Sequence, residues 1–381
     1  MKVQYILFFL FLCFSIIGKA INFSQVNIAW QYDINAPLQF SHRVISENKK
    51  ISVFLRIRTD SLYKWNYDFL VQDGYETENH KEITPIKIDT LLDVKGHVVV
   101  RLDIIREVPD ILVIQISRSE EYYYYDIGLK IGKLSFPSIY PIDEEGLPIF
   151  ENFINRSGFK WMNNHSFYAM KYEDSAGPAD PPMADMKPLA PRADLDTSFL
   201  FTDFIEFEEN HFYTVRKDSL ASTGVTVLRT PPYYPEYRKL TELVESMLYL
   251  TSEVEMKSLL NSKDLKKSFD SFWINNFNTK PRARNAIRTY YNDVEEANKL
   301  FTDFKAGWKT DRGMILIVFG KPNEVYRTNS LEEWYYDSGE LFEFTIISSF
   351  FSSRTYTLRR NKAMEENWYR KIASIRKGIN E

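Results

Sequence analysis

The hydrophobic pattern of the chain changes its period at the proline-rich stretch Pro231–Pro235. Before it, short apolar and aromatic runs are broken by turn residues, which is typical of consecutive β-strands. After it, apolar residues recur about every 3.6 positions, as along one face of a helix. The charge balance changes as well: residues 21–234 carry 22 basic and 31 acidic side chains, and residues 235–381 carry 24 and 21. We therefore expect regions of different architecture, and neither charge balance predicts a nucleic-acid partner.

Residues 1–20 are predicted to be a secretory signal peptide. Lys2 gives a positive start, Tyr5–Ile17 is apolar, and Gly18-Lys19-Ala20 offers a small residue for cleavage at Ala20. The apolar run has 13 residues, fewer than the roughly 18 of a membrane-spanning helix. We therefore expect no transmembrane helix after signal removal.

The only cysteine, Cys13, lies inside this expected signal peptide. Leu12 precedes it where a bacterial lipidation signal usually has a small residue, so lipid attachment is disfavoured. An exported chain without thiols cannot use disulfides, thiolate catalysis or cysteine metal ligation. This favours a bacterial envelope, with the protein in the periplasm, associated with the outer membrane or extracellular.

Residues 21–137 are expected to form an antiparallel β-sandwich-like domain. Ile51–Arg58 alternates most clearly, with apolar odd positions and mostly polar even positions. Eight strands at this spacing favour a sandwich. The expected strands are Val26–Tyr32, Leu38–Ile45, Ile51–Arg58, Lys64–Gln72, Ile83–Ile88, His97–Ile104, Ile111–Ser117 and Tyr123–Ile131.

Four consecutive tyrosines, Tyr122, Tyr123, Tyr124 and Tyr125, form a candidate aromatic binding surface for a glycan or a partner. Successive side chains of a strand alternate between faces, so two of them could enter the core while two lie on the surface. The competing interpretation is strand propensity together with core filling. We favour this second interpretation because strands are rich in aromatic residues without any ligand.

Residues 138–234 are expected to form a second β-rich region with a Pro-rich loop at residues 174–196. Strands are expected at Phe199–Phe207, Phe212–Lys217 and Val225–Arg229. The acidic side chains of the loop lack the spacing and the turn glycine of a calcium site. We therefore expect a solvated acidic loop without a metal. These acidic residues are Asp180, Asp185, Asp194 and Asp196.

Residues 235–381 are expected to form an α+β domain in which helices precede an antiparallel sheet. Helical stripes begin near Leu240 and Ser262, Ser252 and Glu255 resemble a capping box, and Pro281 suits the first turn of the longest helix. A last amphipathic helix carries Met364, Trp368, Ile372 and Ile375. The expected strands are Met314–Phe319, Leu331–Asp337, Leu341–Ile347 and Arg354–Arg359.

A motif-like stretch, Gly307-Trp308-Lys309-Thr310-Asp311-Arg312-Gly313, joins the longest helix to the first of these strands. As a structural corner, Gly307 would end the helix in a left-handed conformation, and Trp308 would bury its ring. Thr310 or Asp311 would accept backbone N–H bonds, while Arg312-Gly313 would form the turn into the strand. Functionally, Asp311, Arg312, Lys309 and Glu324 could instead line a cleft.

This stretch, with Gly320-Lys321-Pro322 and Asn323-Glu324 after it, resembles the GWxTD domain family of exported bacterial proteins. The resemblance covers about Pro235 to Arg376 and implies helices before the motif and strands after it. It implies no catalytic mechanism and no cofactor.

Catalytic candidates are few elsewhere in the sequence, and we assign no catalytic residue. The histidines His42, His80, His97, His165 and His211 lack metal-ligand spacing, and none follows the motif. The leading hypothesis is therefore a non-enzymatic exported protein that contacts other envelope proteins in an interaction or assembly role. The alternatives are a carbohydrate-binding or glycan-processing protein, and binding of extended chains at an exposed strand edge.

Overall fold

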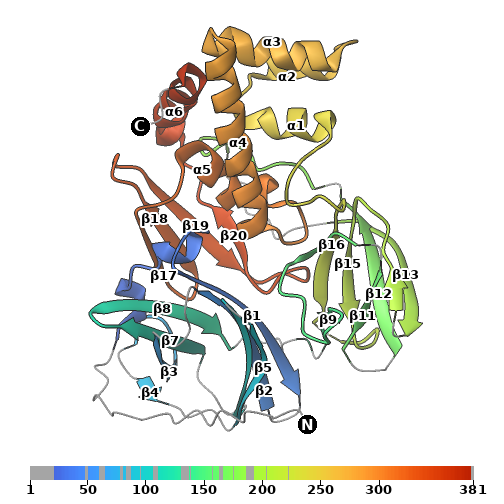
Figure 1. Ribbon diagram of the computed structural model, residues 1–381, viewed down its shortest axis with the longest axis vertical. Helices are drawn as coiled ribbons and strands as arrows, with labels where there is room; N and C mark the ends of the chain where they lie inside the picture. The colour runs from blue at the N-terminus through green and yellow to red at the C-terminus, as the bar shows by residue number, and fades with distance from the viewer. Residues whose placement is uncertain are drawn as a thin grey trace, which may run out of the picture.

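The computed structural model describes most of the chain beyond the expected signal peptide, which lies outside the described residues. The described residues are 21–47, 50–59, 65–77, 80–82, 87–94, 96–105, 110–129, 137, 139–156, 158–162, 166–174, 176–185, 193–202, 204–221 and 223–378. Figure 1 shows two β regions and, beside both, a region in which helices cover a sheet. The α+β multidomain class is confirmed.

The first region is an antiparallel sandwich, as predicted. One sheet has the order β1-β2-β6-β5, from β1 (Leu38–Glu47), β2 (Lys50–Thr59), β6 (His97–Ile105) and β5 (Lys87–Val94). The other has the order β4-β3-β7-β8, from β4 (His80–Glu82), β3 (Asn66–Gln72), β7 (Ile111–Arg118) and β8 (Glu121–Gly128). Val53, Leu102 and Leu112 are fully buried between the sheets. In each strand, inward-facing residues such as these alternate with outward-facing ones, and this alternation is the sequence pattern that predicted the strands.

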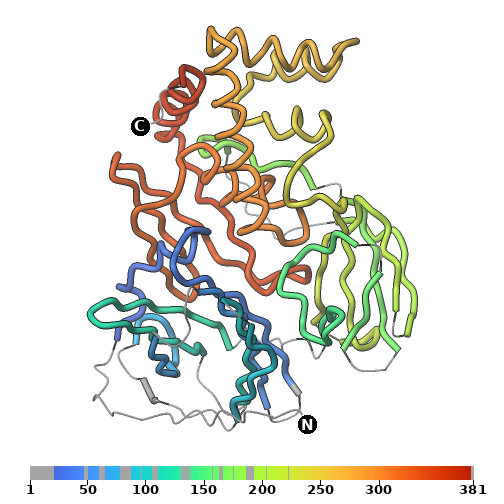
Figure 2. Tube along the Cα trace, viewed as in Figure 1, coloured from blue at the N-terminus to red at the C-terminus, as the bar shows by residue number. Residues whose placement is uncertain are grey.

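The expected strand Val26–Tyr32 is wrong. Its second half forms the 3₁₀ turn η2 (Ala29–Tyr32), and another 3₁₀ turn, η1 (Phe23–Gln25), precedes the segment. The side chain of Asn27 accepts bonds from the backbone N–H groups of Ala29 and Val325, at 2.9 and 3.0 Å. Such local side-chain bonds compete with strand pairing. Figure 2 shows this blue segment beside the orange C-terminal sheet, where Ile28 N–H donates to Val325 O at 2.9 Å.

The second region contains a five-stranded and a three-stranded sheet. The larger has the order β10-β16-β15-β12-β13, from β10 (Phe153–Ile154), β16 (Val225–Arg229), β15 (His211–Arg216), β12 (Ser166–Glu173) and β13 (Leu195–Thr202). The smaller has the order β14-β11-β9, from β14 (Phe204–Glu206), β11 (Gly158–Trp161) and β9 (Pro141–Ile142). Its core, around Trp161 and Phe167, also contains Phe54 and Val99. This region therefore packs on the outer face of the β1-β2-β6-β5 sheet.

The four aspartates of the Pro-rich loop are exposed, as the predicted solvated loop requires, but the described part of the loop also packs on a neighbouring region. Residues 176–185 lie against the C-terminal region, where Ala179 N–H donates to Lys309 O at 2.9 Å. Asn361 N–H donates to Pro182 O at 2.8 Å. Ala179 is buried, and Asp196 already belongs to β13. Proline and alanine expose little polar surface, so they suit a segment that packs on a neighbouring domain without pairing as a strand.

The C-terminal region follows the predicted order of helices and then a sheet. Before the sheet come α1 (Leu240–Ser246), η4 (Met247–Tyr249), α2 (Glu253–Leu260), α3 (Leu265–Phe277), α4 (Lys280–Phe301), η5 (Gly307–Lys309) and α5 (Asp311–Phe319). The sheet has the order β17-β18-β19-β20, from β17 (Glu324–Arg327), β18 (Leu331–Tyr335), β19 (Leu341–Ile347) and β20 (Thr355–Leu358), followed by η6 (Lys362–Met364) and α6 (Glu365–Lys377). The capping box of Ser252 with Glu255 and the early proline of α4 are both confirmed.

The expected strand Met314–Phe319 is wrong, because these residues are the end of helix α5. All six side chains are buried, since α5 lies between α4, α6 and β20. A helix that is buried on every side has no polar face, so its sequence is a continuous apolar run that periodicity cannot distinguish from a buried strand. None of the helices in the described residues is long and apolar enough to cross a membrane.

Candidate functional site

The motif starts the central helix α5 and does not end α4. Thr310 is the N-cap: its Oγ1 accepts from Gly313 N–H at 3.0 Å and donates to Gly307 O at 2.7 Å. Arg312 and Gly313 lie inside α5, so the expected turn into a strand is wrong. The expectation that Thr310 or Asp311 accepts a backbone N–H is confirmed.

The two motif glycines allow close approach of backbones. Gly307 lies in η5 after α4 has already ended at Phe301, so the expected left-handed helix end is wrong. A Cβ at Gly307 would lie 2.0 Å from Ala297 O, and one at Gly313 would lie 2.0 Å from Gly307 O. Any side chain at either position would push η5 away from α4 or from the start of α5.

Trp308 is a core residue, as the structural interpretation expects. Its side chain is 2% exposed. The indole Nε1 donates to the Tyr237 hydroxyl at 2.7 Å, and the backbone N–H donates to Asn298 Oδ1 at 3.1 Å. The Trp308 carbonyl accepts from the Tyr249 hydroxyl at 3.1 Å. Each polar group of the residue is therefore satisfied inside the fold, which is the usual requirement for a buried indole.

Asp311 connects the start of α5 to the end of the sheet. Its Oδ2 accepts from Leu358 N–H at 2.9 Å, and its Oδ1 accepts from Arg360 Nη2 at 2.6 Å. Arg360 Nη2 also donates to the carbonyl of Asp180 in the Pro-rich segment, at 2.9 Å. Lys309 extends this contact through an ion pair with Asp174 at 3.3 Å. Both carboxylate oxygens of Asp311 therefore serve the packing of the domain.

Arg312 points from α5 toward the junction with the sandwich. Its guanidinium carbon lies 3.4 Å from the centroid of the Tyr356 ring and 4.7 Å from that of Phe301. Its Nη1 donates to the Tyr32 hydroxyl at 3.1 Å and lies 3.6 Å from Glu332 Oε1. Cation–π contacts and an ion pair thus hold the cation between two regions.

A buried charge network joins the sandwich to the C-terminal sheet. Arg327 Nη1 donates to both carboxylate oxygens of Asp126 at 2.7 Å, and its Nε donates to Glu332 Oε2 at 2.7 Å. Tyr32 and Tyr75 donate their hydroxyls to Glu332 and Asp126, at 2.8 and 2.6 Å. Neither carboxylate side chain is exposed to solvent.

The electrostatics of this network favour ionised carboxylates. Burial alone would raise the pKa of Asp126, but the charges of Arg327 and Arg354 outweigh it and hold that pKa well below its usual range. Burial likewise acts to raise the pKa of Glu332, and Arg327 and Arg312 lower it. Because each buried charge has partners of opposite sign, the network holds the regions together without an unpaired ion.

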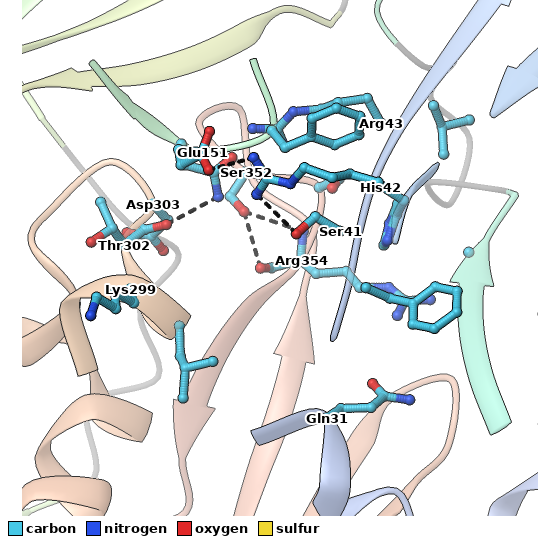
Figure 3. A pocket seen from close by; sticks show the side chains of 18 of the residues that line it. Gln31, Ser41, His42, Arg43, Glu151, Lys299, Thr302, Asp303, Ser352 and Arg354 are labelled. Atoms are coloured by element: carbon cyan, nitrogen blue, oxygen red, sulfur yellow. Dashed lines mark hydrogen bonds and ion pairs between the residues drawn. The ribbon is translucent and has the colours of Figure 1, made fainter. Parts of the chain in front are cut away.

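An open cleft of about 770 Å³ lies between the three regions, bordered by this network. Figure 3 shows Ser41 and Arg43 from β1 facing Glu151, Ser352 and Asp303 from the other two regions. Among its described lining residues, seven cationic side chains meet four carboxylates. The cations are Arg43, Arg56, Arg58, Lys299, Arg312, Arg327 and Arg354, and the carboxylates are Asp33, Asp126, Glu151 and Asp303.

A second cavity, of about 350 Å³, lies directly against the motif. Thr310, Asp311 and Arg312 line it together with the Pro-rich segment, and Asp303 and Arg312 line both cavities. Burial raises the pKa of Asp303 to about 6, although its carboxylate accepts from Lys305 N–H at 3.1 Å. The motif thus reaches the central cleft through the side chain of Arg312.

Residues 211–377 match the family model described as the GWxTD domain. The chain contains a GWxTD domain. The match begins in β15, before Pro235, so it includes two strands of the second β region together with the helices and the C-terminal sheet. No protein with a curated description matches the chain.

The tyrosine run lies ahead of the GWxTD domain and does not form one surface. Tyr122 is 56% exposed, whereas Tyr125 is buried with its hydroxyl 2.7 Å from His42 Nδ1. The ring of Tyr123 packs edge-on against Trp30 and Trp65 inside the sandwich. Tyr124 is half-buried on the opposite face of the strand. Alternation along β8 therefore separates the four rings.

The three histidine side chains that the structure describes, those of His42, His97 and His211, lie apart. Burial, together with the charge of Arg354, lowers the pKa of His42 to about 3. His97 lies in β6 opposite Arg58, and His211 lies in β15 of the second β region. The side chains of His80 and His165 lie outside the described residues. Within the described residues, no three His, Cys, Asp or Glu side chains are grouped to hold a metal ion.

Apart from Arg312 of the motif, the arginines of the central cleft were missed as site residues. Arg56 and Arg58 were visible only as the polar positions of the alternating strand Ile51–Arg58, which ordinarily face solvent. The signal that could have singled them out is two arginines at positions i and i+2, because these share one face of a strand. The packing of a second domain against that face could not be read from the pattern.

Proposed function

We propose that this protein is a non-enzymatic exported protein of a bacterial envelope, and that it acts by binding another envelope protein in the central cleft. The observation that carries the proposal is the buried network of Arg327, Asp126 and Glu332, which holds the walls of an open cleft. A preformed concave site avoids much of the ordering that binding otherwise requires.

The motif supports a binding role over a catalytic one. Both carboxylate oxygens of Asp311 are engaged by Arg360 and Leu358, so this carboxylate is already committed to packing. A general acid or base needs a proton-accepting atom directed at a substrate. The export step rests on the signal peptide expected in residues 1–20.

Site-specific photo-crosslinking in the native envelope tests the proposal. A photoreactive residue at Phe350, which is exposed at the cleft, is expected to give one dominant protein adduct. The same residue at Val254, which is 78% exposed on α2 away from the cleft, is the matched control and is expected to give none. Equal adducts at both positions would contradict the proposal.

A glycan-related role is the competing outcome. Purified protein that hydrolyses a glycan or peptide, and loses that activity in a folded Asp311→Asn variant, would overturn the non-enzymatic assignment. Binding to a glycan array that is lost when Tyr122 is replaced would favour the carbohydrate-binding alternative. The separation of the tyrosine rings predicts a blank array.

A further inference from the structure

Three arginines form a row on one wall of the cleft. Arg56 and Arg58 lie two positions apart in β2, and Arg43 lies in β1 opposite Phe54, diagonal to Arg56. Diagonal positions of this kind are roughly 7–8 Å apart on one face of an antiparallel pair. The three guanidinium groups therefore border one side of the cleft, and each of them lines it.

Two of these arginines are held in place by contacts that leave N–H groups available. Arg43 Nε donates to Ile149 O at 3.0 Å, and its guanidinium carbon lies 5.3 Å from the centroid of the Tyr140 ring. Arg56 Nη2 donates to Ser41 Oγ at 3.1 Å, and its guanidinium carbon lies 4.8 Å from the Phe150 ring centroid. Arginines held in this way lose little conformational freedom when they bind an anion.

The positive charge of this row exceeds what the described residues around it neutralise. Arg56 Nη1 pairs with Glu151 at 2.7 Å. The side chain of Arg58 forms no hydrogen bond or ion pair with the described residues, and the buried Nε of Arg56 has no acceptor among them. Burial lowers the pKa of Arg58, and the charge of Arg56 lowers it further. A guanidinium whose charged form is disfavoured in this way gains from a nearby anion.

Glu151 shows which anion suits the row. Its side chain is one-third exposed, yet its carboxylate sits at 2.7 Å from Arg56 within the cleft. One of the three arginines of the row, Arg56, therefore already binds a carboxylate. Arginine forks match the geometry of carboxylates and hold them by charge-assisted bonds.

We propose that the cleft takes an acidic segment of a polypeptide, whose carboxylates bind along the row of Arg43, Arg56 and Arg58. This inference rests on the proposed function, since it names the chemistry of the protein partner that would occupy the cleft. The carboxylates would occupy the sides of Arg43 and Arg58 that Glu151 does not reach. The aromatic rings of Tyr140 and Phe150 pack against the guanidinium groups of Arg43 and Arg56 and hold them in position.

Fluorescence polarisation with a labelled peptide of alternating glutamate and glycine tests the proposal on the purified protein. Arg58→Gln and Arg43→Gln are each expected to weaken binding roughly tenfold or more, the size of one charge-assisted hydrogen bond. Arg284→Gln, at an exposed position of α4, removes the same charge and is expected to change nothing. A matching peptide of glutamine and glycine is expected not to bind.

Three outcomes would overturn the proposal: no binding of the glutamate peptide, equal weakening by Arg284→Gln, or preference for inorganic phosphate or an oligouronate over the peptide. The Arg58 side chain has no hydrogen-bond or ion-pair partner among the described residues, so its variant is expected to keep the melting temperature of the parent. Failure here with a dominant adduct at Phe350 would reject the acidic chemistry and keep the proposed function. Binding of the glutamate peptide without any adduct at Phe350 would support the acidic chemistry of the cleft and reject the proposed function.

Discussion

Arg327 in β17 donates to both carboxylate oxygens of Asp126 in β8, at 2.7 Å each, across the boundary between the GWxTD domain and the sandwich. The two residues are 201 positions apart, and neither is exposed beyond a few per cent. Around this pair, Tyr32, Tyr75 and Glu332 complete the hydrogen bonds. A sandwich and an α+β domain that share such a network are expected to unfold together.

Truncation of Trp308 tests the role of the motif in packing. We expect Trp308→Ala to lower the free energy of unfolding by roughly 3–5 kcal/mol, as large aromatic truncations in cores do. The indole is buried against Tyr249, and its loss leaves the Tyr237 hydroxyl without its donor. Urea unfolding measures the difference. An unchanged midpoint would mean that the ring contributes nothing to the core.

The close approach at Gly307 predicts an asymmetry between glycines. Gly307→Ala places a methyl group 2.0 Å from Ala297 O and is expected to destabilise the protein by roughly 1–3 kcal/mol, as overpacking does. The matched control is Gly177→Ala in the Pro-rich segment, where an added Cβ would meet nothing within 4 Å. Thermal unfolding of the two variants compares them directly. Equal melting temperatures would show that η5 can move away from α4 without loss.

Asp311 is expected to act through stability and not through catalysis. Asp311→Ala leaves Arg360 without its carboxylate partner and Leu358 N–H without its acceptor, at a cost of roughly 3 kcal/mol. Asp311→Asn keeps an acceptor for the backbone N–H and should cost less. Chemical denaturation of both variants checks this order. A larger loss in the asparagine variant would contradict it.

The pKa of Asp303 predicts a specific dependence of stability on pH. Burial raises this pKa to about 6, above the value near 3.9 of an unfolded aspartate. The unfolded state therefore loses its proton first as pH rises, and the free energy of unfolding falls between about pH 4 and pH 6. Asp303→Asn removes this effect, because the asparagine has no proton to lose.

We expect Asp303→Asn to be more stable than the parent above pH 6, by roughly 3 kcal/mol, with the difference vanishing near pH 4. The asparagine oxygen can still accept the bond from Lys305 N–H. Denaturation across this pH range measures the curve. A difference that stays constant with pH would show that Asp303 is not the titrating group.

The elements that follow from local pattern were predictable, and those decided by tertiary contact were not. The strand at Ile51–Arg58 and the capping box at Ser252 appear as predicted, because a short local pattern of residues determines each of them. Helix α5 was mistaken for a strand because tertiary burial removed its polar face. Val26–Tyr32 was mistaken because the side chain of Asn27 bonds to backbone groups.

The candidate site shows the same limit. The motif marked the position of Arg312 and Asp311, but their partners come from Tyr32, Glu332 and Arg360, which are distant in the sequence or lie in other elements. No periodic signal connects a polar strand position such as Arg58 to a domain that packs over it later in the chain. Sequence reasoning therefore located the corner of the GWxTD domain and missed the cleft that the corner borders.

The double-mutant cycle of Asp126→Asn and Arg327→Met tests most directly whether the buried network holds the regions together. Each single variant leaves a buried partner uncompensated and is expected to cost roughly 3–5 kcal/mol in urea unfolding. The double variant is expected to recover about 2–3 kcal/mol relative to additivity, with the parent unfolding in one transition. Additivity within about 0.5 kcal/mol, or separate transitions for the sandwich and the GWxTD domain in the parent, would contradict this.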